Sequence, residues 1–95
     1  MNGRKRLQQA ALFARFGVPR QVRPDATDED GTATVRVYVV PSREAADAFA
    51  AADRETWGNR ARVELRESLG WCVVVDLRAV VAAHRAAHPL PRIRG

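Results

Sequence analysis

The chain has 95 residues, of which 46% are hydrophobic and 28% are charged, and its formal net charge is +5. This length accommodates one domain with one modest core and excludes a substrate cleft between two domains, while the composition excludes wholesale disorder. The single cysteine, Cys72, excludes an internal disulfide bond; we expect it to be a buried structural residue, and it favours a cytoplasmic location over a secreted one.

Residues 3–16 are predicted to form an amphipathic helix. Its apolar stripe contains Leu7, Ala10, Ala11 and Ala14 and is widened by Leu12, Phe13 and Phe16. Gly17 and Pro19 follow and end the helix. Residues 1–23 hold no acidic residue, so we expect a basic N-terminal helix and arm whose cations are Arg4, Lys5, Arg6, Arg15, Arg20 and Arg23.

Residues 24–31 contain a proline, a glycine and four acidic residues, and they are predicted to form an acidic, solvated linker. The alternative is a metal site built from carboxylates, because Asp28 and Asp30 faintly resemble the ligands of a calcium-binding loop. The twelve-residue spacing with a terminal glutamate that such a loop needs is absent, and this favours the linker.

A strand is predicted over residues 32–40, because the valines at positions 35, 37 and 39 alternate with Arg36, Tyr38 and Val40. The alternation indicates a sheet with one buried face, and Pro41 ends the strand. Ser42 then caps a helix that is expected to end near Trp57, and the alanines of this helix let it lie close to the sheet.

Residues 60–67 and 71–75 are predicted to form the two strands of a hairpin. The odd-numbered apolar side chains of the first strand face inward and its charged side chains face solvent, which predicts a sheet covered on one side only. A helix capped by Asp76 is expected over residues 77–87. The alternative is that the second strand continues through Val81, because β-branched residues recur there.

This order of elements predicts an α+β fold with a small three-stranded sheet, in β-α-β-β-α order, and an extra N-terminal amphipathic helix. We expect the α+β domain to span residues 32–88 and residues 89–95 to form a flexible basic tail. Much of the hydrophobic content is alanine and only six residues are aromatic, so the core is expected to be thin and self-association would supplement it.

The sequence holds no constellation typical of an enzyme. Ser42 and Ser68 lack the glycine-flanked turn of a hydrolase nucleophile, and no glycine cluster forms a phosphate or dinucleotide loop. We therefore expect neither catalysis nor a cofactor. His84 and His88 have the i, i+4 spacing of a metal-binding pair, but two histidines without further ligands are more typical of surface residues.

The positive charge predicts an acidic partner. Fifteen arginines and one lysine, with acid-free segments at both ends, favour a non-catalytic module that binds nucleic acid or another acidic surface. The expected contacts are the cations of residues 1–23 together with Arg92 and Arg94. A solvated arginine-rich surface without a partner is the other interpretation of these charges. Residues 7–14, an uncharged run, are too short to span a membrane, so we expect no membrane partner.

A second hypothesis is a structural subunit that self-assembles into a homo-oligomer, with Leu12, Phe13 and Phe16 as interaction residues. Residues 12–19, followed by Arg23, Pro24 and a valine-rich strand, resemble the start of small phage head–tail joining proteins, and residues 71–78 resemble their closing strand. The resemblance covers about a third of the chain, and the helix expected after Ser42 departs from the strand-rich middle of that family. It implies a subunit whose thin core is completed by neighbouring chains.

Overall fold

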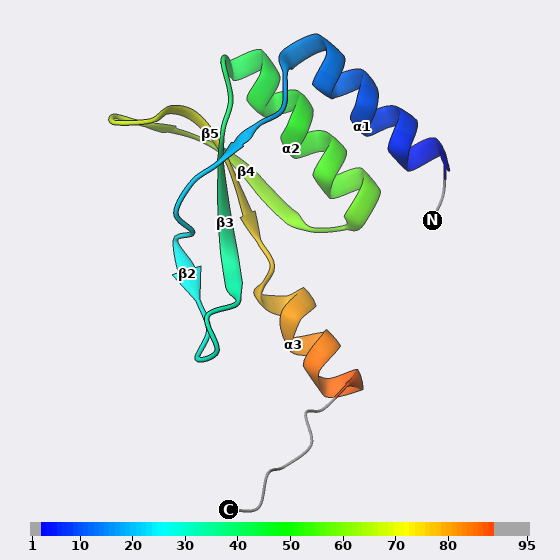
Figure 1. The fold of residues 1–95 in the computed structure, drawn as a ribbon, viewed down its shortest axis with the longest axis vertical. Helices are drawn as coiled ribbons and strands as arrows, with labels where there is room; N and C mark the ends of the chain where they lie inside the picture. The colour runs from blue at the N-terminus through cyan, green and yellow to red at the C-terminus, as the bar shows by residue number, and fades with distance from the viewer. Residues whose placement is uncertain (1–2, 89–95) are drawn as a thin grey trace, which may run out of the picture.

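The computed structural model describes residues 3–88, with the backbone alone for residues 3–7. Within this range the chain forms, in order, α1 (Gly3–Phe16), β1 (Arg20–Gln21), β2 (Ala26–Thr27), β3 (Ala33–Val39), α2 (Arg43–Trp57), β4 (Arg60–Arg66), β5 (Gly70–Asp76) and α3 (Arg78–Ala87). The fold is α+β, as predicted, and its strands form one antiparallel sheet (Figure 1).

The strands of the sheet follow the order β1-β3-β5-β4, and β2 also pairs with β3. Every pair is antiparallel, so β3 and β4 run in the same direction on either side of β5 and α2 connects them. The predicted count of three strands was wrong, because β1 and β2 add two short strands beside β3. These strands have two residues each, too few to show the alternation from which a strand is recognised.

Local sequence signals fix the ends of α2 and the hairpin that follows it. The Ser42 hydroxyl accepts a hydrogen bond from the backbone N–H of Ala45 at 3.1 Å, which confirms the predicted cap. Gly58, with φ of 67°, ends the helix in the left-handed region that glycine adopts without strain. The turn between β4 and β5 closes at Gly70, which has a φ of 83°.

The core on the α2 side of the sheet is built from small residues. Ala45, Ala46 and Ala50 of α2 are fully buried and belong to one cluster with Val73 and Val75 of β5. Alanine keeps the helix axis close to the strands, because its side chain adds little thickness to the interface. α1 packs against α2, and Phe16 at its C-terminal end joins this core (Figure 1).

The opposite face of the sheet also has a core. Val35, Val37, Cys72 and Val74 form a second buried cluster, and the expectation of one buried face was therefore wrong. Val22 and Ala26, from the segment that carries β1 and β2, pack on this cluster, together with Leu69 of the hairpin turn. The segment between α1 and β3 thus covers this face of the sheet, in place of a packed helix.

The choice between strand and helix after β5 is settled in favour of the helix. Asp76 ends β5, and the N-cap of α3 is Leu77, so the predicted cap at Asp76 was wrong by one residue. The Oδ1 of Asp76 still accepts a hydrogen bond from the backbone N–H of Arg78 at 3.0 Å. α3 has no buried residue and extends away from the sheet (Figure 1). None of the described helices is long and apolar enough to cross a membrane.

Candidate functional site

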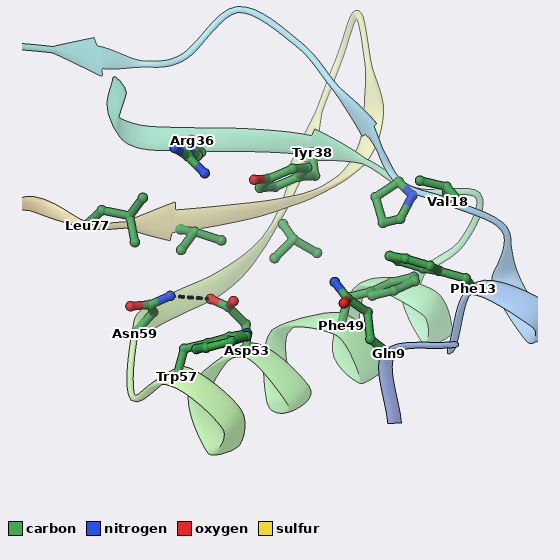
Figure 2. A pocket seen from close by; sticks show the side chains of 13 residues that line it. Gln9, Phe13, Val18, Arg36, Tyr38, Phe49, Asp53, Trp57, Asn59 and Leu77 are labelled. Atoms are coloured by element: carbon green, nitrogen blue, oxygen red, sulfur yellow. Dashed lines mark hydrogen bonds between the residues drawn. The ribbon is translucent and has the colours of Figure 1, made fainter. Parts of the chain in front are cut away.

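A hollow of about 380 Å³ lies between α1, α2 and the sheet. Val73 and Val75 of β5 form its floor, and side chains of α1, α2 and β3 form its walls. Figure 2 shows Arg36 and Tyr38 on the strand side, with Asp53, Asn59 and Trp57 on the helix side. The site therefore combines an apolar lining with a few polar groups that come from different elements, which is typical of ligand pockets.

Arg36 brings a positive charge into this apolar region. It pairs with Val75 across β3 and β5, and its side chain lines the hollow rather than the solvent. Its Nε is closed to solvent and has no hydrogen-bond partner within residues 3–88. An unsatisfied N–H of a buried polar group costs about 1–3 kcal/mol, and more when the group is charged. Packing alone therefore gives no reason for an arginine at this position.

Asp53 and Asn59 lie across the hollow from Arg36 (Figure 2). Burial raises the pKa of the Asp53 carboxyl, and a hydrogen bond from the Asn59 amide, at 3.4 Å, offsets part of this shift. No ion pair joins Asp53 to Arg36 in the described part of the chain. The two groups are thus partly desolvated without neutralising each other.

Aromatic rings close the side of the hollow next to α1. Phe49 of α2 packs against Phe13 and Phe16, with ring centroids 6.1 and 6.0 Å apart. The residues predicted to mediate self-assembly thus contact the chain's own second helix, and Leu12 is half-buried beside it. These contacts anchor α1 within the chain, while the predicted role of the three residues between chains stays a prediction.

The structure describes the predicted basic segment only in part. The side chains of Arg4, Lys5 and Arg6 lie outside the described residues, although the backbone places them in the first turns of α1. Arg15, near the other end of the helix, pairs with Glu44 and lies over the ring of Phe16. Arg20 and Arg23 are exposed on the segment around β1. Arg92 and Arg94 lie outside the described residues.

Most other described arginines contact carboxylates of the same chain. Arg66 of β4 donates two hydrogen bonds to Asp25, at 2.8 and 2.5 Å, and a third to Glu64 at 3.1 Å. This bidentate pair links the linker segment to the far strand of the sheet, and it lowers the pKa of Asp25. Further ion pairs are Arg43–Asp47, Arg62–Glu64, Arg78–Asp76 and Arg85 with Asp28 and Asp30.

The acidic turn and α3 meet in one charged cluster. The carboxylates of Asp28 and Asp30 bind the guanidinium of Arg85, at 2.6 and 2.7 Å, so they neutralise a cation of the chain itself. His84 and His88 stack with ring centroids 4.7 Å apart. No group of three or more metal-ligating side chains occurs among the described residues.

Cys72 lies in the second core cluster and is fully buried. Burial raises the pKa of its thiol, which keeps the sulfur in the protonated, unreactive form. Its environment is that of a structural cysteine.

Neither Arg36 nor Asp53 was among the predicted site residues, because the hollow joins elements that are far apart in sequence. The available signal was an arginine inside a strand of valines, which alternation alone assigns to solvent. Comparisons of the chain with protein-family models, with curated proteins and with solved structures gave no match.

Proposed function

We propose that the protein is a small, non-catalytic binding module of the cytoplasm that contacts nucleic acid through its basic segments. The observation that supports this proposal is the exposure of Arg20 and Arg23 and their lack of a carboxylate partner among the described residues. Both are exposed, and neither makes an ion pair with the residues that the structure describes, whereas Arg15, Arg66 and Arg85 are held by carboxylates. Exposed cations without an internal counter-ion are the ones available to phosphates.

The spacing of the basic residues supports an extended anion as the partner. Residues 4–6 lie near the start of α1 and Arg20 lies just beyond its end. A helix of 14 residues is about 20 Å long, at about 1.5 Å per residue. Two groups of cations at this separation match a polyanion with regularly spaced phosphates better than a compact acidic ligand.

The test is a salt series of affinities for a fluorescently labelled mixed-sequence duplex, measured by fluorescence anisotropy. The double variant Arg20→Ala/Arg23→Ala should bind more weakly, and its log–log salt slope should fall by about 2, because each lost phosphate contact removes roughly one unit. The triple variant Arg4→Ala/Lys5→Ala/Arg6→Ala should reduce the slope further.

The matched control is Arg43→Ala/Arg62→Ala, which removes the same amount of charge from arginines that already pair with carboxylates. It should leave the salt slope near that of the wild type. An equal loss in both double variants would show that net charge alone governs binding. An unchanged slope in Arg20→Ala/Arg23→Ala would show that this segment is not the contact.

A second candidate is a structural subunit that assembles with copies of itself, similar in kind to small phage head–tail joining proteins. The observation that favours it is the exposed apolar surface of α3 and the β4 edge. Val80 is 49% exposed and Leu65 is 62% exposed, and α3 has no buried residue. Sedimentation velocity over a range of concentrations tests this candidate: oligomers that Val80→Glu dissociates support it, and monomer at every concentration contradicts it.

A further inference from the structure

The guanidinium of Arg36 has a buried Nε for which the described residues supply no hydrogen-bond acceptor. The side chain projects from the middle of β3 toward α2, where its neighbours on β5 are Val73 and Val75. No ion pair is formed by Arg36 with the described residues, and its Nε meets neither solvent nor an acceptor. A guanidinium with one buried, unpaired N–H is stabilised when an anion enters beside it.

The lining of the hollow contains one charged side chain besides that of Arg36. Asp53 is the acidic residue in the lining, and it keeps its hydrogen bond to Asn59 rather than pairing with Arg36. Burial raises the pKa of its carboxyl, and the hydrogen bond from Asn59 offsets part of this shift. The guanidinium therefore remains the group with which a carboxylate would interact most strongly.

The walls favour a flat apolar body attached to that charge. Phe13, Phe49, Tyr38 and Trp57 line the hollow, and Val73 and Val75 form its floor. Aromatic rings pack against one another in offset or edge-on geometries that add to the gain from burial. A volume of about 380 Å³ is in the range that small ligands occupy in proteins.

We propose that the hollow between α1, α2 and the sheet binds a small aromatic carboxylate, with the carboxylate on Arg36 and the ring between the aromatic side chains. Arg36 and a carboxylate can form two parallel hydrogen bonds, the strongest pairing open to either group. None of the cations of the proposed function lines this site, so either proposal can fail while the other stands.

The test compares two probes of nearly the same shape, trans-cinnamate and its neutral amide, cinnamamide. Each is titrated into the full-length, isotope-labelled protein and followed by backbone amide chemical shifts. Small ligands of this size bind in the millimolar range or tighter. Cinnamate should bind about tenfold to a hundredfold more tightly than cinnamamide, because only the carboxylate forms a charge-assisted pair. The largest shifts should fall at Tyr38, Asp53 and Val75.

Arg36→Met retains the length of the side chain and removes the charge, so the preference for cinnamate should disappear. Because the variant also removes a buried N–H that has no partner, its midpoint of urea unfolding should equal or exceed that of the wild type. The matched control is Arg60→Met on the exposed start of β4, which should keep the preference. Arg36→Lys keeps the charge and should lose only part of the preference.

Three results would overturn the proposal. One is equal affinity of the wild type for cinnamate and cinnamamide, which needs no variant to be observed. Another is a preference that survives in Arg36→Met. The third is a set of shifts that maps outside the hollow, for example onto α3.

Discussion

The second core cluster can be tested by mutation, because it lies on the sheet face that was predicted to be exposed to solvent. Val74 is at its centre: it occupies the central strand β5, is 0% exposed and pairs with Val37 across the sheet. The variant Val74→Ala removes two methyl groups from this cluster. If the segment around β1 and β2 covers this face, the loss in free energy of unfolding should equal that of a substitution in a solvent-excluded core.

The expected magnitude follows from two contributions. Two buried methyl groups are worth about 1.6 kcal/mol at about 0.8 kcal/mol each. The space that they leave adds up to about 1 kcal/mol, at about 24 cal/mol per Å³ of unfilled volume. We therefore expect the free energy of unfolding to fall by about 2–3 kcal/mol, a large part of the 5–15 kcal/mol typical of a small domain.

Urea unfolding, followed by tryptophan fluorescence and by far-ultraviolet circular dichroism, measures this loss. With a denaturant slope of about 1–2 kcal/mol/M, the midpoint should fall by roughly 1–3 M. The control is Val18→Ala, which makes the same chemical change at a side chain that is 73% exposed and should cost less than about 0.5 kcal/mol. Equal losses in the two variants would refute the conclusion that this face is a core.

Three further predictions concern stability and reactivity. Ser42→Ala removes the cap of α2 and should lower the free energy of unfolding by about 1 kcal/mol, measured by thermal unfolding. The hydrogen bonds from Arg66 depress the pKa of Asp25, so their contribution is complete above the ordinary carboxyl pKa and is lost as the pH falls below it; unfolding between pH 5 and pH 2 at about half-unit steps should show an acid-sensitive loss that is smaller in Asp25→Asn. Asp76, whose pKa is lowered to about 2 by Arg78, should add to the loss at the acidic end of that range. The buried thiol of Cys72 should react with a thiol-specific chromophore only after urea unfolds the chain.

The elements with local signals could be predicted from the sequence. The helix that begins after Ser42, its end at Gly58, and the hairpin from β4 to β5 all follow from caps, turns and alternation within a few residues. The short strands β1 and β2 could not be predicted in this way. They exist because β3 offers an edge for pairing and because Val22 and Ala26 cover its buried valines, and both conditions are set by tertiary contacts.

The residues available for binding were harder to predict, because ion pairs between residues far apart in the sequence decide which arginines are already neutralised. Arg66 meets Asp25, which is 41 positions away in the sequence, and Arg85 meets Asp30, which is 55 positions away. A count of charges along the chain treats these arginines as available, whereas the fold neutralises them. Arg36 shows the opposite case. Alternation assigns its side chain to solvent, but Tyr38 and Val40, on the same side of the strand, belong to the core on the α2 side of the sheet.

The position of α3 connects these observations. α3 starts directly after β5, close to the part of the sheet that α2 leaves open, and Leu77 at that junction lines the hollow. The ion pairs of Arg85 with Asp28 and Asp30 tie the helix to the turn between β2 and β3. Acidic residues that were predicted to be solvated therefore help to fix the position of α3 beside the sheet.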